Sequence, residues 1–272
     1  MVSISITSLR VLVAEDNPVN QLFVARLVER QGHSVHVVSN GQLAIDALRQ
    51  ETFDVVLMDL GMPLLGGFET VRQLRQQEKQ TGDHLPIIAM TASATSFDRV
   101  RCLAVGMDDF ISKPVQAAAL AAALARVVHG NLQTWQESET PDRMDPAANE
   151  MPACNLAAAL RKLGGDKNFL NQLVQLFLDT VPEQLQSLQT AMQGRHRKTI
   201  GDMAHAVKGS VRYFFAHSVY DTAQRLEIGS LSDDMAVLEQ TYAMLLNHIR
   251  RLCTELRMLF SVQEVCPTSG VL

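Results

Sequence analysis

The sequence predicts an α/β domain with a doubly wound parallel sheet, followed by an all-α domain with a four-helix bundle. In the first half, short β-branched runs alternate with longer amphipathic stretches, as in consecutive βαβ units. After Asn155 the strand signals stop and apolar residues recur at helical spacing. The 272 residues of the chain suit two domains of about 100 to 150 residues each.

Five strand-helix pairs account for the α/β domain. The runs RVLVA, HSVHVV, FDVVLMD, PIIAM and DFIS predict strands at residues 10–14, 33–38, 53–59, 86–90 and 109–112. The intervening helices are expected at residues 18–31, 41–50, 67–80, 96–105 and 115–128. Asn17 can cap the first helix with Pro18 at its first position, where no backbone N–H partner is needed.

A polar, acidic stretch separates the two halves. Residues 129–152 contain Pro141, Pro146 and Pro152, which disfavour a helix or a strand, so we expect a flexible linker there.

The second half predicts helices throughout. Leu170, Leu173, Val174 and Phe177 illustrate its apolar spacing. Breaks at Gly194 and around residues 229–232 divide it into three main helices after a short first one at residues 156–163. This pattern indicates a four-helix bundle.

Composition excludes several classes of protein. The 24 Lys and Arg residues are outnumbered by 29 Asp and Glu residues, which argues against a nucleic-acid partner. The 4 cysteines lack CxxC spacing, as expected of free thiols in a reducing compartment. There is no signal-peptide pattern and no apolar run of roughly 18 to 20 residues, so we expect a cytoplasmic protein without membrane insertion.

Acidic residues follow two strands of the predicted sheet. Glu15 and Asp16 come after the first strand, and Asp59 ends the third. Because the carboxyl ends of parallel strands share one edge, these carboxylates should converge there. Their mutual repulsion predicts a hard divalent cation, most naturally Mg²⁺.

A hydroxyl and an ammonium are expected at the same edge. Thr91 follows the fourth strand and Lys113 follows the fifth. With Mg²⁺ and Lys113 neutralising charge, an Asp59 oxygen could attack a phosphoryl group and form an acyl phosphate. Thr91 would then donate a hydrogen bond to a phosphoryl oxygen.

The segments VLVAEDNPVN, VVLMDLGMP, IIAMTA and DDFISKP, in this order and at these separations, resemble a two-component response-regulator receiver domain over residues 9–128. The resemblance implies a flavodoxin-like sheet in the order 2-1-3-4-5. It implies that Asp59 is the phosphoacceptor, that Asp16 and Asp59 bind Mg²⁺ directly and that Glu15 acts mostly through bound water. It also implies a backbone carbonyl ligand from Gly61 and a switch coupling Thr91 to Phe110.

One histidine of the second half has a distinctive setting. His205 lies away from the apolar stripe formed by Ile200, Ala204, Val207, Val211 and Phe214 on the same helix. We therefore expect it to be accessible to solvent. Lys208 at i+3 supplies a cationic neighbour and Gly209 at i+4 leaves room, which suits acceptance of a doubly negative group.

The segment MAHAVKGSVRYF resembles the A-H-x-x-K-G-S signature of histidine-containing phosphotransfer domains, and NLAAALRKLGGDKNFLNQLVQLFLDTVPEQLQSL is similar to the first half of their bundle. The resemblance places such a domain at residues 153–262, with His205 as the carrier. Where many members have Gly-Ala, this chain has Phe215-Ala216. Phe214 and Phe215 are expected in the core.

Together these features predict a phosphorelay protein. An upstream histidine kinase would supply Asp59, and His205 would pass the group to a downstream response-regulator receiver. Such a chain is a phosphotransfer protein rather than a turnover enzyme, and it has no ATP-binding signature. Met1 lies just before the first strand, which favours a standalone protein over a fragment of a hybrid kinase.

Two alternatives use the same residues. In the first, phosphorylated Asp59 exposes a docking surface and the helical domain is only a binding platform. The second is a Mg²⁺-dependent phosphohydrolase, which is disfavoured because Gly61 occupies the place of a general acid. A transcription factor would need a helix-turn-helix with a basic face, which the second half does not offer.

Overall fold

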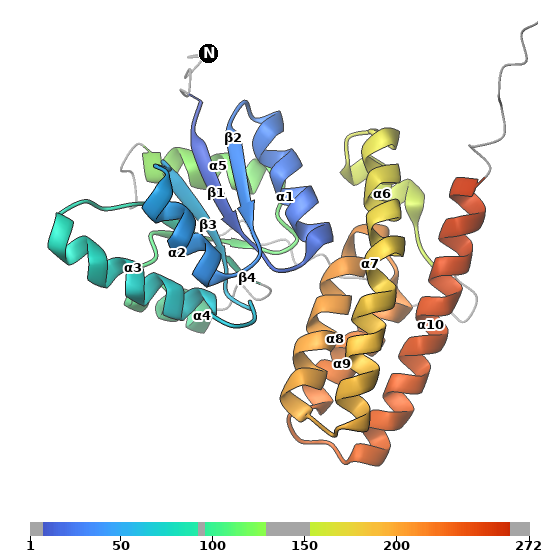
Figure 1. Ribbon diagram of the computed structural model, residues 1–272. Helices are drawn as coiled ribbons and strands as arrows, with labels where there is room; N and C mark the ends of the chain where they lie inside the picture. Colours follow the sequence, from blue (N-terminus) through green and yellow to red (C-terminus); the bar gives the residue numbers. More distant parts are fainter. Residues whose placement is uncertain (1–7, 92–95, 129–152, 262–272) are drawn as a thin grey trace, which may run out of the picture. The chain divides into compact units, whose positions relative to one another are not determined.

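The structure, a computed structural model, describes residues 8–91, 96–128 and 153–261. The chain divides into two compact units between Thr140 and Pro141. The first unit is α/β and the second is helical (Figure 1). The expected linker at residues 129–152 lies outside the described residues.

The first unit is a parallel sheet in the order β2-β1-β3-β4-β5, which confirms the predicted topology. The strands are β1 (Arg10–Ala14), β2 (Ser34–Val38), β3 (Val55–Asp59), β4 (Ile87–Thr91) and β5 (Asp109–Ser112). The helices are α1 (Pro18–Arg30), α2 (Gly41–Gln50), α3 (Gly67–Thr81), α4 (Ser96–Val105) and α5 (Ala117–Val128).

Alternate side chains of the sheet enter two separate cores, since successive residues of a strand face opposite sides. Val11 and Val13 of β1 pack with residues of α1 and α5. Leu12 and Ala14 pack with residues of α2, α3 and α4. Helices therefore cover both faces, which explains why β3 and β4 are buried along their whole length.

The strand order reverses between β1 and β3, because β2 lies outside β1 while β3, β4 and β5 follow on the other side. In open parallel sheets, ligands bind beyond the carboxyl ends of the strands at this reversal. The fold thus places the segments after β1 and β3 side by side, where β1 pairs Ala14 with Met58.

The second unit contains one short helix and four longer ones. They are α6 (Leu156–Lys162), α7 (Lys167–Gln193), α8 (Arg197–Val211), α9 (His217–Gly229) and α10 (Met235–Ser261). The four-helix bundle is confirmed, but the division into three main helices after a short one is wrong. A 3-10 turn at Arg212–Phe214 and a left-handed Phe215 separate α8 from α9.

The apolar stripe of α8 faces the core as predicted. Its five residues are fully buried: Ile200, Ala204, Val207, Val211 and, in the following turn, Phe214. The expectation for Phe215 is wrong, because this residue is half-buried, has a φ of 53° and lies outside the core. Lys162 Nζ lies 5.5 Å from the centroid of the Phe215 ring.

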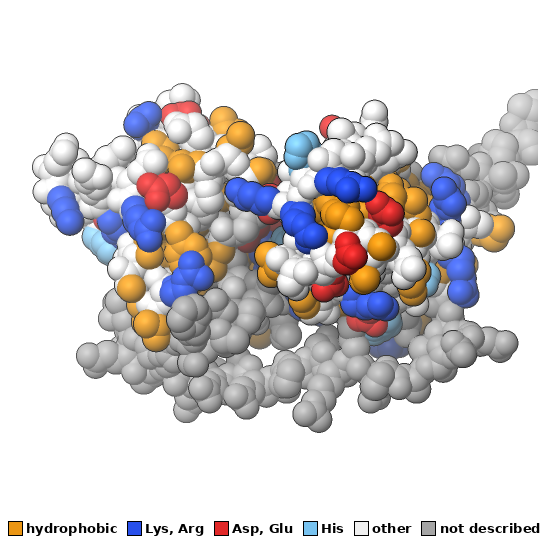
Figure 2. All heavy atoms as spheres, turned by 90° about the horizontal axis from the view of Figure 1, so that it is seen from below, with side chains coloured by type: hydrophobic (Ala, Val, Ile, Leu, Met, Phe, Trp, Pro, Cys, Tyr) orange, Lys and Arg blue, Asp and Glu red, His pale blue; other side chains and the backbone are white. Residues whose placement is uncertain are grey.

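None of the helices in the described part of the chain combines the length and apolar character needed to span a membrane. On the face shown in Figure 2, Lys and Arg side chains alternate with acidic and hydrophobic ones on both units. This face therefore carries charges of both signs.

Candidate functional site

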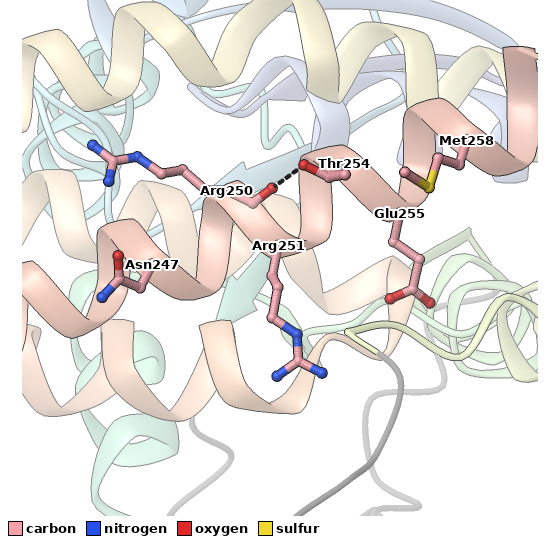
Figure 3. Close-up of a pocket in the computed structure, with 6 residues that line it drawn as sticks. All are labelled: Asn247, Arg250, Arg251, Thr254, Glu255 and Met258. Carbon is pink, nitrogen blue, oxygen red and sulfur yellow. Dashed lines mark hydrogen bonds between the residues drawn. The ribbon is translucent and has the colours of Figure 1, made fainter.

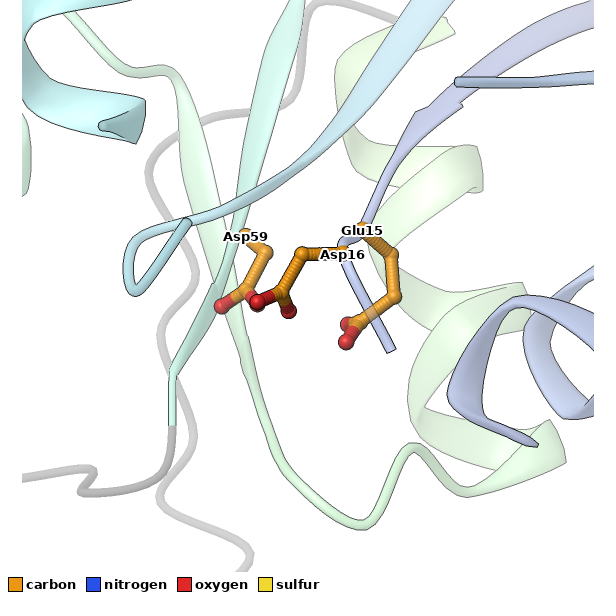
Figure 4. A group of neighbouring side chains, drawn as sticks. All are labelled: Glu15, Asp16 and Asp59. Atoms are coloured by element: carbon orange, nitrogen blue, oxygen red, sulfur yellow. The ribbon is translucent and has the colours of Figure 1, made fainter. Parts of the chain in front are cut away.

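The three carboxylates predicted at the sheet edge converge in the first unit. Glu15 and Asp16 directly follow β1, and Asp59 is the last residue of β3 (Figure 4). One carboxylate oxygen from each residue lies within 4.8 Å of the others. Glu15 and Asp59 are buried and Asp16 is half-buried. Oxygen ligands at this spacing suit a hard divalent cation.

Lys113 joins this cluster from the end of β5. Its Nζ lies 2.6 Å from Glu15 Oε2 and 2.7 Å from Asp59 Oδ2. The backbone N–H of Lys113 donates to the carbonyl of Thr91, which connects the ends of β5 and β4. The structure thus brings together the predicted carboxylates, ammonium and hydroxyl-bearing residue at one edge of the sheet.

Burial and the neighbouring charges shift the pKa values of two members of the cluster. Burial raises the pKa of Glu15 to about 7, a rise that Asp59 reinforces and Lys113 opposes. Burial lowers the pKa of Lys113, but the carboxylates of Glu15 and Asp59 raise it by more. The pKa of Lys113 therefore lies above its usual value. Three carboxylates lie together here and Lys113 pairs with two of them, so a cation at this edge would favour their ionised forms.

Residues of α1 hold Glu15 in place. Asn20 Nδ2 donates to Glu15 Oε1 at 2.8 Å, and Gln21 Nε2 donates to the Glu15 carbonyl at 2.6 Å. Asn17 caps α1 by accepting from the amides of Val19 and Asn20, as expected from the sequence. Sequence analysis did not identify Asn20, although its position one turn into a capped helix after the acidic pair could have indicated it.

The segment after β3 contacts Asp59 closely. The amide of Gly61 donates a hydrogen bond to Asp59 Oδ1 at 3.2 Å. The role of the Gly61 carbonyl as a metal ligand stays a prediction. Gly67 begins α3 directly against the same residue. A Cβ at Gly67 would lie 2.3 Å from the Asp59 carbonyl oxygen, so only glycine permits this approach.

The two residues expected to form a switch lie on neighbouring strands. Thr91 is buried at the end of β4, next to β3, which pairs Asp59 with Met90. Phe110 is half-buried on β5, opposite Ala89 of β4, and packs against the core on the side of α2, α3 and α4. Their coupling stays a prediction.

In the second unit, His205 lies on α8 with one third of its side chain exposed. Its Nδ1 is 2.7 Å from Glu227 Oε1 on α9. The expected accessibility is thus partial. Gly201, one turn earlier, lies against α9, where an added Cβ would meet Ser230 Oγ at 2.6 Å. This close packing of α8 on α9 brings Glu227 to His205.

Lys208 also pairs with Glu227. Its Nζ donates to Glu227 Oε2, and its side chain is almost buried. The predicted cationic neighbour therefore exists, but in this structure it faces a carboxylate. Burial raises the pKa of Glu227, but hydrogen bonds from His205 and Lys208 lower it by more. The pKa of Glu227 therefore lies below its usual value.

Sequence reasoning missed Glu227. It lies on a different helix, 22 residues beyond His205, and no local motif marks it. The only available signal was its place on the apolar-patterned helix that follows the histidine, which many surface glutamates share.

A groove runs along α10, away from these residues in sequence. It is lined by Asn247, Arg250, Arg251, Thr254, Glu255 and Met258 (Figure 3). Glu255 accepts hydrogen bonds from the Ala153 amide and from the Cys154 thiol, whose pKa burial and Glu255 raise to about 12. These contacts attach Ala153 and Cys154 to α10.

Comparison with known proteins gives two family matches. Residues 11–125 match response regulator receiver domains, and residues 172–261 match Hpt domains. The chain is 28% identical to the sensor histidine kinase GacS of Pseudomonas protegens over 80% of its length and 24% of that protein. It is 30% identical to the virulence sensor protein BvgS of Bordetella pertussis over 81% of its length and 18% of that protein.

A solved structure covers the first unit. The receiver domain of the sensor histidine kinase PA1611 from Pseudomonas aeruginosa, with a magnesium ion in its active-site cleft, is 36% identical. The match covers 45% of this chain and 99% of that structure, with a TM-score of 0.41. The chain spans about a quarter or less of the length of GacS and BvgS.

Proposed function

This chain belongs to the two-component phosphorelay proteins, with a receiver domain at residues 11–125 and an Hpt domain at residues 172–261, and we propose that Asp59 and His205 are successive phosphoryl carriers. The observation that carries this proposal is the convergence of Glu15, Asp16, Asp59 and Lys113 at one edge of the sheet. Three carboxylates and an ammonium gathered at one edge are typical of a phosphoryl-acceptor site and are not expected of charged residues on an ordinary solvated surface.

The acidic cluster fits Mg²⁺ by its donor set. Asp16 and Asp59 are proposed as direct ligands, Glu15 as a ligand through water, and Gly61 as a ligand through its carbonyl. When bound, Mg²⁺ would offset the charge of the phosphoryl oxygens. The geometry supports this assignment, because one carboxylate oxygen of each of the three residues lies within 4.8 Å of the others.

In the first transfer, an Asp59 oxygen attacks the phosphorus of an upstream phosphohistidine. The P–N bond breaks, the electron pair returns to the donor imidazole, and Asp59 becomes an acyl phosphate. Lys113, which lies 2.7 Å from Asp59 Oδ2, then pairs with the phosphoryl oxygens. Thr91 at the neighbouring strand end donates a hydrogen bond to one of them.

In the second transfer, His205 accepts a phosphoryl group from an acyl phosphate. Its partly exposed ring and the nearby Lys208 ammonium support this role. The donor and acceptor partners are proposed to be an upstream histidine kinase and a downstream response-regulator receiver, and the compartment to be the cytoplasm, where such partners act. The name of the relative GacS, a sensor histidine kinase, supports the proposed kinase partner.

The entry point can be tested with acetyl phosphate as the phosphoryl donor. We expect Mg²⁺-dependent phosphorylation of the full chain, located by mass spectrometry at Asp59 and abolished in Asp59→Ala. The exposed Asp83 gives a matched control, and Asp83→Asn should be labelled like the wild type. Undiminished labelling of Asp59→Ala would contradict the proposal. So would labelling of the wild type that is equally extensive with and without Mg²⁺.

A further inference from the structure

The contact between His205 and Glu227 determines which ring nitrogen carries a proton. An ionised carboxylate can only accept hydrogen bonds, so Nδ1, at 2.7 Å from Glu227 Oε1, must be the donor. The lowered pKa of Glu227 is consistent with its ionised form. In a neutral imidazole the other nitrogen, Nε2, then holds the lone pair.

Nε2 is also the nitrogen available for chemistry. The described residues give it no hydrogen-bond partner, and one third of the side chain is exposed. The charged groups placed against the ring are Glu227 from α9 and, through that carboxylate, Lys208 from α8. A protonated Nε2 could not attack phosphorus, so the tautomer decides whether His205 is competent.

We propose that Glu227 is a positioning residue for phosphoryl transfer at His205, one that keeps the proton on Nδ1 and presents an unprotonated Nε2. This inference rests on the proposed function of His205. During transfer the Nε2 lone pair forms the N–P bond, the P–O bond of the donor acyl phosphate breaks, and the donor leaves as a carboxylate. The proton stays on Nδ1.

The product of that step is a phosphorylated imidazolium, whose positive charge faces Glu227. A fixed negative group aimed at a charge that develops during reaction lowers the barrier without reorganisation. Onward transfer runs through the same imidazolium in reverse, with the N–P bond breaking and the electron pair returning to Nε2. In donation the same carboxylate keeps the proton on Nδ1, so that the leaving group is a neutral imidazole rather than an imidazolate. Glu227 therefore promotes both the acceptance and the donation of the phosphoryl group.

A purely structural role is the alternative to be separated. Lys208 is nearly buried, and Glu227 could matter only because it neutralises that ammonium. Two substitutions distinguish these roles. Glu227→Gln keeps the shape and an accepting oxygen but removes the charge, and Glu227→Ala removes both. Asp221→Asn, at an exposed carboxylate of the same helix, is the matched control.

The first test is ¹⁵N NMR of His205 in the unphosphorylated full chain, which needs no activity. We expect the wild type to carry its proton on Nδ1, and Glu227→Ala to exchange between both tautomers while its helical unit stays folded by circular dichroism. Asp221→Asn should give the wild-type spectrum. A wild-type His205 with its proton on Nε2 would overturn the proposal.

The second test is the rate of phosphoryl transfer to and from His205, with a phosphorylated receiver domain as donor. We expect Glu227→Ala to slow both directions about tenfold to hundredfold, the effect of losing a hydrogen bond to a charged group. Glu227→Gln should slow them about tenfold because the charge alone is lost. Wild-type rates in both variants would overturn this inference, whereas a wild type that is never labelled at His205 would overturn the proposed function instead.

Discussion

At the scale of single residues, Phe215 adopts a conformation that its side chain does not favour. Its φ of 53° lies in the left-handed region, which costs a residue with a Cβ roughly 1 to 2 kcal/mol. A glycine at this position would adopt the same φ without that cost. The sequence showed the departure from the family pattern but not its reason, because φ is set by the turn between α8 and α9.

We predict that the free energy of unfolding of Phe215→Gly exceeds that of Phe215→Ala by about 1 kcal/mol. The glycine variant should therefore unfold at a higher denaturant concentration. Both variants lose the contact with Lys162, so their difference isolates the backbone cost. Urea titrations followed by circular dichroism measure it. Equal stabilities of the glycine and alanine variants would contradict the explanation.

A second residue-scale prediction concerns His33, which is buried and accepts a hydrogen bond from the Leu9 amide at Nδ1. Burial lowers the pKa of His33 below its usual 6.5. The folded state thus favours the neutral ring. Its contribution to stability is complete above pH 6.5 and is lost as pH falls from that value through the folded pKa, by at most about 1.4 kcal/mol per pH unit.

The measurement compares the wild type with His33→Gln at pH 7.5 and pH 5.5, using urea titrations that follow NMR signals of β1 and β2. The stability advantage of the wild type should shrink at the lower pH. An advantage that is the same at both pH values would show that His33 does not titrate as inferred.

At the scale of elements, the start of α3 depends on one glycine. A Cβ at Gly67 would lie 2.3 Å from the Asp59 carbonyl oxygen, whereas a Cβ at the neighbouring Gly66 would meet nothing closer than 3.7 Å. We predict that Gly67→Ala lowers stability by about 1 to 3 kcal/mol, the usual cost of overpacking, and slows phosphorylation of Asp59. Gly66→Ala should change neither.

Thermal unfolding and labelling with acetyl phosphate, performed on both variants, test this prediction. Normal labelling of Gly67→Ala would mean that α3 can move away without displacing Asp59, contrary to the tight contact.

The elements also show how far sequence reasoning reaches. The strands and helices of the first unit lie within two residues of their predicted bounds, because alternating runs and the Asn17-Pro18 start are local signals. The break between α8 and α9 was missed because neither Gly nor Pro marks it. Glu227 was missed for a related reason, since its contact with His205 depends on how two helices pack.

At the scale of the whole molecule, Mg²⁺ should act on only one of the two units, because the carboxylate cluster found in the described residues lies in the first. We predict that Mg²⁺ at ten times its Kd stabilises that unit by about 1.4 kcal/mol and leaves the helical unit unchanged. Hydrogen exchange with and without Mg²⁺ measures both units in one sample. Asp16→Ala should abolish the effect, and equal protection of both units would contradict the assigned site.

The relay itself is tested most directly by the chemical stability of the label in the full chain, since acyl phosphates are lost in base and phosphohistidine in acid. After incubation with acetyl phosphate and Mg²⁺, we predict a base-stable label on His205 in the wild type and a base-labile label alone in His205→Gln. Asp59→Ala should carry neither. A base-stable label on His205 that forms without Asp59 would contradict the order of the two carriers.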